Sequence, residues 1–282
     1  MRAFYPMVLT GLFLAPYAFA QNSGQASEQA VGAFVESHSS VSRIGKIARW
    51  EEGVCPSVTG LAPTFTKFIA KRVRDLAAQV GAPVNADENC KSNIDVVFTT
   101  DPQALLDNIR AKQPVMLGYF DNNAQADSMA IVNRPIQAWH ATQTVDLRGN
   151  TVIDSRNTMN GEMTRGGKSL NSSGSRLGDG LHSSYFHAII VANPNKLGEY
   201  EIGTLADHIA LVALAQPALQ AACPALPSIL DLTSADCRKD VPVKALTAAD
   251  TGFLRGVYQM DTGTSVQTQK AAIAVRLKEA MQ

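Results

Sequence analysis

The chain has 282 residues, and its 25 lysines and arginines balance its 25 aspartates and glutamates. The absence of a basic stripe excludes the usual signature of a nucleic-acid-binding protein, and no basic amphipathic helix indicates binding to a membrane surface. The length suits one large domain or two small ones, with enough residues to bury a sizeable core.

Residues 1–20 have the pattern of an export signal. Arg2 gives a basic start, residues 7–15 are apolar, and Ala18-Phe19-Ala20 fits a small-x-small cleavage signal. The apolar run is too short to span a bilayer, and no second long apolar run follows it. We therefore expect a signal peptide, followed by a periplasmic or secreted protein that has no membrane span after signal cleavage.

Four cysteines in an exported chain predict two disulfides. We expect the pairs Cys55–Cys90 and Cys223–Cys237, because each pair would close one local supersecondary unit. Reduced, buried cysteines are the alternative. A zinc site built from these cysteines is not expected, since no Cys-x-x-Cys spacing occurs.

The first part of the chain predicts a lead-in and then a strand–helix–strand unit. Residues 21–43 are rich in Ser, Gln, Ala and Glu, which predicts a flexible lead-in with a short helix near residues 28–36. Extended segments are expected over residues 44–50, 54–60 and 93–99. Between them, residues 64–80 predict a helix whose apolar spacing comes from Phe65, Phe68, Ile69, Val73, Leu76 and Val80. This order favours a right-handed crossover between neighbouring parallel strands.

The middle of the chain predicts one helix, several strands and a long loop. Asp101-Pro102 opens a helix over residues 103–112. Strands are expected over residues 129–133, 136–146, 150–154 and 186–191. Residues 155–184 consist largely of Gly, Ser, Asn and Arg, so we expect a long loop there.

The domain is expected to fold around a helix over residues 203–216. Thr204 is the expected N-cap, and Pro217 stops the helix. The helix is apolar on nearly every face, which predicts that it is buried. Two further helices are expected, over residues 247–258 with Thr247 as N-cap, and over residues 268–281.

The order of these segments resembles the zincin metalloproteases, specifically the matrixin-like metzincins. The likeness rests on helix 203–216, the turn with Ser228-Ile229-Leu230, and the segment from Leu246 to Tyr258. The unit at 47–99 resembles the opening of that fold, and an edge strand and helix over 186–216 complete the likeness. The resemblance implies an α+β, zincin-like fold. Its parts are a mixed twisted sheet, a central buried helix of the active-site type and C-terminal helices, in a single domain over residues 44–282.

In that family the central helix carries His-Glu-x-x-His-x-x-Gly-x-x-His, which holds zinc and supplies a general base. Laid on this chain, the ligand positions become Ala206, Ala210 and Gln216, and the base becomes Asp207. Alanine cannot bind a metal, and His208 lies about 200° round the helix from Ala206. The resemblance thus implies a degenerate site with no zinc and no cofactor. Asp207 either compensates the helix dipole or keeps a polar role in a cleft.

Three functions stay open at this point. The first is a non-catalytic zincin-like pseudoenzyme that binds a peptide, protein or envelope component in the former substrate cleft. The second is an exported hydrolase that uses His140, His182 or His187, with Asp154 nearby. The third is a structural envelope protein without a cleft function. A similar Leu-Ala-Asp-(Tyr/His)-x-Ala helix occurs in exported proteobacterial proteins, and that likeness implies no activity.

Overall fold

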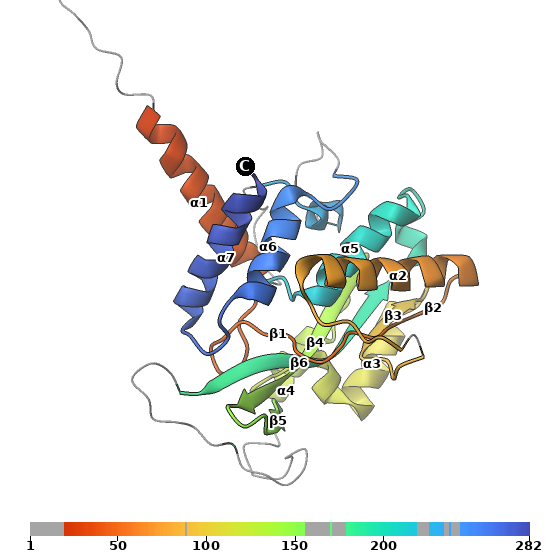
Figure 1. Ribbon diagram of the computed structural model, residues 1–282. Coiled ribbons are helices and arrows are strands. Elements are labelled where there is room, and N and C mark those ends of the chain that lie inside the picture. Colours follow the sequence, from red (N-terminus) through yellow and green to blue (C-terminus); the bar gives the residue numbers. More distant parts are fainter. Residues whose placement is uncertain are drawn as a thin grey trace, which may run out of the picture.

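Figure 1 shows the computed structural model, which describes residues 20–87, 89–155, 170, 179–218, 226–233, 237 and 243–282, with side chains from residue 28 onward. Residues 1–19 of the predicted signal peptide, Cys223 and most of the predicted loop at 155–184 lie outside this part of the chain. The described residues form an α+β fold with seven α-helices and a mixed six-stranded sheet, in agreement with the predicted class. None of the described helices combines the length and the apolar character needed to cross a membrane.

The helices are α1 (Ala20–His38), α2 (Pro63–Val80), α3 (Pro102–Lys112), α4 (Asn123–Met129), α5 (Ile202–Leu214), α6 (Ala248–Gln259) and α7 (Val266–Ala280). The strands are β1 (Arg49–Trp50), β2 (Pro56–Thr59), β3 (Ile94–Phe98), β4 (Ile136–Asp146), β5 (Thr151–Ile153) and β6 (Leu181–Ala192). Short 3-10 helices are η1 (Pro114–Leu117), η3 (Pro194–Lys196) and η4 (Ile229–Thr233).

The sheet has the order β2-β3-β6-β4-β5, and β1 pairs with β6 outside this path. Strands β2, β3 and β6 are parallel, whereas β4 is antiparallel to both β6 and β5. The predicted crossover is confirmed as a pair of parallel neighbours, β2 and β3, joined through α2. The strand expected at 186–191 is present within β6. Its expected position at the edge of the sheet is wrong, because β6 pairs with β1, β3 and β4 and is central. Its run Ala188 to Ala192 is apolar on both faces, as a strand covered on both sides requires.

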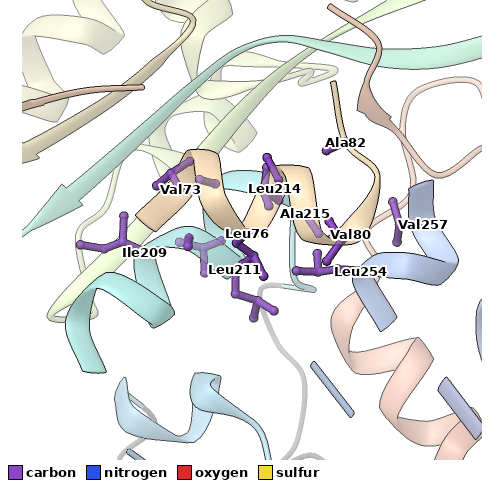
Figure 2. Close-up of a cluster of buried hydrophobic side chains, with 14 of the residues drawn as sticks. Val73, Leu76, Val80, Ala82, Ile209, Leu211, Leu214, Ala215, Leu254 and Val257 are labelled. Atoms are coloured by element: carbon purple, nitrogen blue, oxygen red, sulfur yellow. The ribbon is translucent and has the colours of Figure 1, made fainter. Parts of the chain in front are cut away.

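Helices cover both faces of the sheet (Figure 1). On one face, α2 and α5 share the main core with β3, β6 and α6. On the other face, α3 and η1 pack against Trp139, Ile189 and Val191 in a smaller core. Figure 2 shows the centre of the main core, where Val73, Leu76 and Val80 of α2 meet Ile209, Leu211 and Leu214 of α5. Every residue of α5 from Thr204 to Leu214 is buried, so the prediction of a buried central helix is confirmed.

The ends of α5 differ from the prediction. Glu201 occupies the N-cap position, and Thr204 lies inside the helix, where its hydroxyl donates to the carbonyl of Lys244 (2.8 Å). The helix ends at Leu214, so Gln216 lies beyond it. A short polar side chain marks a helix start only when the chain is extended there, and here the extended residue is Glu201.

The expectation of a flexible lead-in over residues 21–43 is wrong for residues 28–38. These residues lie in α1, and Val31, Phe34 and Val35 are buried in the main core. The three side chains recur at helical spacing (i, i+3, i+4), which forms one apolar stripe despite the polar composition around it. The short helix expected near residues 28–36 lies within α1, and composition concealed only its burial in the core.

Two other expectations are corrected in the middle of the chain. The strand expected at 129–133 is absent, since Met129 ends helix α4. Asn122 starts that helix, because its side chain accepts from the N–H of Gln125 (2.9 Å). The loop expected to reach residue 184 ends earlier, because β6 begins at Leu181 and pairs there with Asp146 of β4.

The Cys55–Cys90 disulfide is confirmed, with the two Cα atoms 6.1 Å apart. It joins the residue before β2 to the loop before β3, as expected for a bridge that closes a local unit. Cys237 is also disulfide-bonded, whereas Cys223, its predicted partner, lies outside the described residues. Disulfide bonding is compatible with an exported protein.

Helices α6 and α7 approach each other most closely at two glycines of α6. A Cβ atom at Gly256 would lie 2.7 Å from the Cα of Ile273, and one at Gly252 would lie 2.9 Å from the Cα of Leu277. Both contacts are with backbone atoms, which cannot move aside as a flexible side chain can. The close packing of α6 on α7 therefore requires residues without side chains at these positions.

We expect Gly256→Ala to lower the free energy of unfolding by about 1–3 kcal/mol through overpacking. Gly203 provides the matched control, because it also lies in a helix but has no atom within 4 Å of a Cβ position. Gly203→Ala should be neutral or stabilise by up to about 1 kcal/mol. Denaturant unfolding of both variants measures the difference, and equal stabilities would contradict the close approach.

Candidate functional site

The positions that correspond to zinc ligands in the zincins are mostly in the hydrophobic core. Ala206 and Ala210 are 0% exposed and belong to the main core between α2 and the sheet. Gln216 is half-buried, and its backbone N–H donates to the Tyr185 hydroxyl (3.1 Å) while its carbonyl accepts from the N–H of Ser40 (3.0 Å). Ala206 and Ala210 therefore contribute to core packing within α5, and the backbone of Gln216 joins the chain beyond the helix to Tyr185 and Ser40.

Asp207, at the general-base position, is bound from two sides. One carboxylate oxygen forms an ion pair with Arg72 of α2, and the other accepts from the N–H of Leu246, just before α6 (3.0 Å). The Asp207 side chain is buried, and Arg72 covers it from the solvent side. Asp207 thus connects α5, α2 and the segment that leads into α6, a role that neither dipole compensation nor a cleft position had anticipated.

We expect Asp207→Ala to lower the free energy of unfolding by about 2–3 kcal/mol, because it leaves the Arg72 charge and the Leu246 N–H without their partner. The loss lies below that of a fully buried pair, since Arg72 is partly exposed. Asp127→Ala is the matched control, because Asp127 pairs with Arg110 (2.8 Å) while mostly exposed. That change should cost less than about 1 kcal/mol. Equal losses in thermal unfolding would contradict the role of Asp207 in connecting α2, α5 and the segment that leads into α6.

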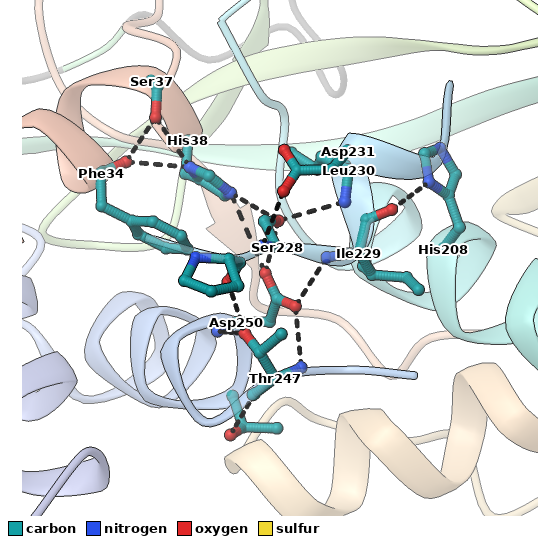
Figure 3. Close-up of polar contacts among 12 residues, drawn as sticks. Phe34, Ser37, His38, His208, Ser228, Ile229, Leu230, Asp231, Thr247 and Asp250 are labelled. Carbon is teal, nitrogen blue, oxygen red and sulfur yellow. Dashed lines mark hydrogen bonds and ion pairs between the residues drawn. The ribbon is translucent and has the colours of Figure 1, made fainter. Parts of the chain in front are cut away.

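A buried polar cluster connects α1, η4 and α6 (Figure 3). The Ser228 hydroxyl donates to Asp250 Oδ1 (2.6 Å) and lies 3.0 Å from His38 Nε2. His38 Nδ1 lies 2.9 Å from the Phe34 carbonyl, which accepts from it. Asp250 Oδ2 also accepts from the N–H groups of Ile229 and Thr247, both at 2.9 Å. Burial raises the pKa of Asp250, although these donors oppose the shift.

The cluster contains the residue types of a serine-hydrolase triad in an unsuitable arrangement. Ser228 lies between the other two groups and donates to Asp250, whereas a nucleophilic serine must pass its proton to the histidine. All three residues are at most 1% exposed, so a substrate has no approach to the hydroxyl. The cluster therefore has a structural role. The Thr247–Asp250 capping box was visible in the sequence, whereas the contribution of His38 from α1 was not.

Three histidines are buried as neutral groups, namely His38, His140 and His208. Burial lowers the pKa of each to about 4. His208 Nδ1 donates to the carbonyl of Ile229 (3.1 Å), and the ring of His140 packs beside Tyr185 with centroids 4.8 Å apart. These rings are packing elements of the core around α5 and α1.

The three histidines predict acid-sensitive stability. Below about pH 6.5 the unfolded chain binds protons on these imidazoles, and the folded chain does not until about pH 4. The free energy of unfolding should therefore fall as the pH falls through this window, by up to about 1.4 kcal/mol per pH unit for each histidine. Asp250 offsets part of this slope, because its raised pKa favours proton uptake by the folded chain.

Denaturant unfolding at a series of pH values between 7 and 4.5 measures this slope. His208→Asn keeps a donor for the Ile229 carbonyl and removes one titrating group, so the slope should decrease by about a third. A stability that stays constant between pH 7 and 5 would show that the histidines are not buried as neutral groups.

The histidines proposed for a hydrolase are separated in the fold. His140 and His187 lie on successive rungs of the β4–β6 ladder, so they point to opposite faces of the sheet. His187 Nε2 pairs with Asp95 Oδ2 (3.1 Å), and His182 Nε2 pairs with Glu51 Oε2 (2.9 Å). Asp154 instead accepts from Arg43, Thr142 and Thr144. Within the described residues, no group of three or more His, Cys, Asp or Glu side chains is arranged to hold a metal ion.

A pocket of about 440 Å³, here called the acidic pocket, opens at the end of the sheet where β6 begins. It is formed by the residue after β1, the β4–β5 turn, the start of β6 and the α6–α7 loop. Its ionisable lining residues are Glu51, Asp146, His182 and Asp261. Its other lining residues are Val145, Leu147, Gly149, Gly180, Thr262 and Gly263.

The carboxylates of this pocket differ in their surroundings. Asp146 is buried and braces the turn, since it accepts from the N–H groups of Arg148 and Asn150. Glu51 and Asp261 are exposed and supply negative charge to the opening. Of these residues, the sequence pattern indicated only His182, because the other residues come from separate segments whose meeting no local pattern encodes.

A buried lysine fixes two walls of the acidic pocket. The ammonium group of Lys46 donates to Asp179 (2.7 Å), to the carbonyl of Leu181 at the start of β6, and to the carbonyl of Gly263 in the α6–α7 loop (3.2 Å). The ammonium group of Lys46 therefore donates to three acceptors within the pocket wall. Lys46 is thus paired within the wall, and at the opening the Glu51 carboxylate contacts His182 (2.9 Å).

Comparison with known proteins returned no match, whether against family models, curated proteins or solved structures. The site is therefore interpreted from its own geometry.

Proposed function

We propose that this chain is an exported, non-catalytic binding protein that holds a cationic group of a peptide or envelope component in the acidic pocket. The observation that carries the proposal is the meeting of three carboxylates and one imidazole around an opening of about 440 Å³, in a chain with no net charge. A local excess of negative charge attracts an ammonium or guanidinium group and raises its rate of association.

The proposal keeps a zincin-like scaffold and moves the binding site. Support for the scaffold comes from the β2–α2–β3 opening and from a buried helix that follows strand β6. The former ligand positions Ala206 and Ala210 are covered by core side chains, so a ligand has no access there. The acidic pocket offers an accessible surface that the former cleft lacks.

The other two functions have less support. A hydrolase that uses His140, His182 and His187 would need them to converge, and each lies in a different environment. A purely structural role in the envelope does not require a charged opening with an exposed leucine, Leu147, at its rim. An apolar rim beside carboxylates suits a peptide that carries both a basic and an apolar side chain.

Fluorescence polarisation with labelled peptides tests the proposal. Peptides with Lys or Arg next to Leu should bind, and matched peptides with Glu in place of the basic residue should not. Glu51→Gln combined with Asp261→Asn should weaken binding about tenfold or more, since each partly exposed charge contributes up to about 1 kcal/mol.

Glu279→Gln is the control, because Glu279 is an exposed carboxylate on α7 with its own partner Arg276. Its affinity for the peptide should equal that of the unaltered protein. Binding that is unaffected by the double substitution, or that prefers acidic peptides, would exclude the acidic pocket as the binding site.

A further inference from the structure

Two phenylalanines of α2 lie on the surface. Phe65 is 46% exposed and Phe68 is 45% exposed, whereas Phe34, Phe98, Phe120 and Phe253 are each at most 8% exposed. The sequence pattern had placed both in the same apolar stripe as Ile69 and Val73. Burial of a phenyl ring is favourable by about 1.5–3 kcal/mol. Two neighbouring exposed rings therefore indicate a surface that binds a membrane or another molecule.

The two rings occupy one side of the N-terminal half of α2. Residues three apart are neighbours on a helix surface, so Phe65 and Phe68 lie together. Ile69 and Val73 lie on the adjoining side of the helix, which is buried in the core against α5. The apolar surface of α2 therefore continues from the core to the solvent, and its exposed part at Phe65 and Phe68 is here called the outer face.

The charge around this outer face is positive. Helix α2 carries Lys67, Lys71, Arg72 and Arg74 against a single carboxylate, Asp75. Lys67 and Lys71 are exposed next to the phenyl rings, and Lys71 pairs with Asp75 at 2.6 Å. Asp75 pairs with Lys71 and Asp207 pairs with Arg72, so the four basic residues of α2 face two carboxylates and leave an excess of two positive charges.

We propose that the outer face of α2 docks on an anionic phospholipid surface, with Phe65 and Phe68 inserted at the level of the headgroups and Lys67 and Lys71 in contact with the phosphates. Aromatic rings beside lysines are the combination that binds at such an interface. A second copy of this face is disfavoured, because it would oppose like charges. A specific protein partner needs about 800 Å² on each side, and two rings on one helix provide only part of such an area.

This docking is peripheral, and it differs from the expectation that no basic amphipathic helix would contact a membrane. That expectation was stated together with the charge balance of the whole chain. Only the structure shows that Phe65 and Phe68 are exposed at the end of the apolar stripe of α2.

Co-sedimentation with vesicles tests the proposal. The purified protein should bind vesicles of phosphatidylcholine with phosphatidylglycerol several-fold more than vesicles of phosphatidylcholine alone, and salt should weaken this binding. Phe65→Ser with Phe68→Ser should reduce the bound fraction about tenfold, because two inserted rings are lost. Lys67→Glu with Lys71→Glu should remove the preference for the anionic vesicles.

Two controls separate this result from general effects. Val275→Ser alters another exposed apolar residue, on α7, and should leave binding unchanged. Glu51→Gln with Asp261→Asn should also leave it unchanged, so failure here is distinct from failure of the proposed peptide site. Circular dichroism melting confirms that each variant is folded.

A tryptophan in place of Phe65 gives a direct reading of insertion. Its emission should shift to shorter wavelength with anionic vesicles, and brominated acyl chains should quench it, whereas Val275→Trp should show neither change. The proposal is overturned if the Phe65/Phe68 variant binds vesicles as well as the unaltered protein. It is equally overturned if light scattering shows a dimer that these substitutions disrupt, or if an acidic peptide binds this face and vesicles do not.

Discussion

The complete burial of α5 is the constraint on which the rest of the structure depends. A helix with no exposed side must meet other residues in every direction, and its two ionisable side chains, Asp207 and His208, cannot reach water. Each needs a partner inside the protein. Asp207 pairs with Arg72 and accepts from the Leu246 N–H, and His208 donates to the Ile229 carbonyl. These few bonds determine how α2, η4 and α6 are placed around the helix.

The same constraint favours small side chains at Ala206 and Ala210, two of the positions that the resemblance aligned with zinc ligands. Alanine at 206 and 210 allows neighbouring core residues to approach α5 closely, and a larger residue would separate them. A position that would have to face a cleft in an enzyme instead contributes to core packing here. The burial of these positions is consistent with a binding surface that lies away from the central helix.

Much of the fold was predictable from local patterns. Helix α2 and strands β3 and β4 followed from apolar periodicity, and the capping residues Asp101 and Thr247 marked the starts of α3 and α6. The errors also have physical causes. The burial of α1 was missed because its three apolar side chains are set in a polar composition, and helix α4 was missed because its start depends on one asparagine cap.

The candidate site was far less predictable than the fold. The acidic pocket unites residues from positions 51 to 263, and their meeting depends on the pairing of β4 with β6 and on the bonds of Lys46. The exposure of Phe65 is likewise invisible in a helical pattern, because periodicity shows which residues share a side and not how many sides are covered.

The Cys55–Cys90 bond has a consequence for the open border of the sheet. Cys55 immediately precedes β2, one of the two strands that end the sheet order, and edge strands are the usual place for aggregation and for exchange of segments between molecules. The bond links the start of β2 to the loop before its neighbour β3. It therefore limits how far β2 can separate from the sheet. A covalent tether of this kind therefore opposes both edge-to-edge pairing and the exchange of this strand between molecules.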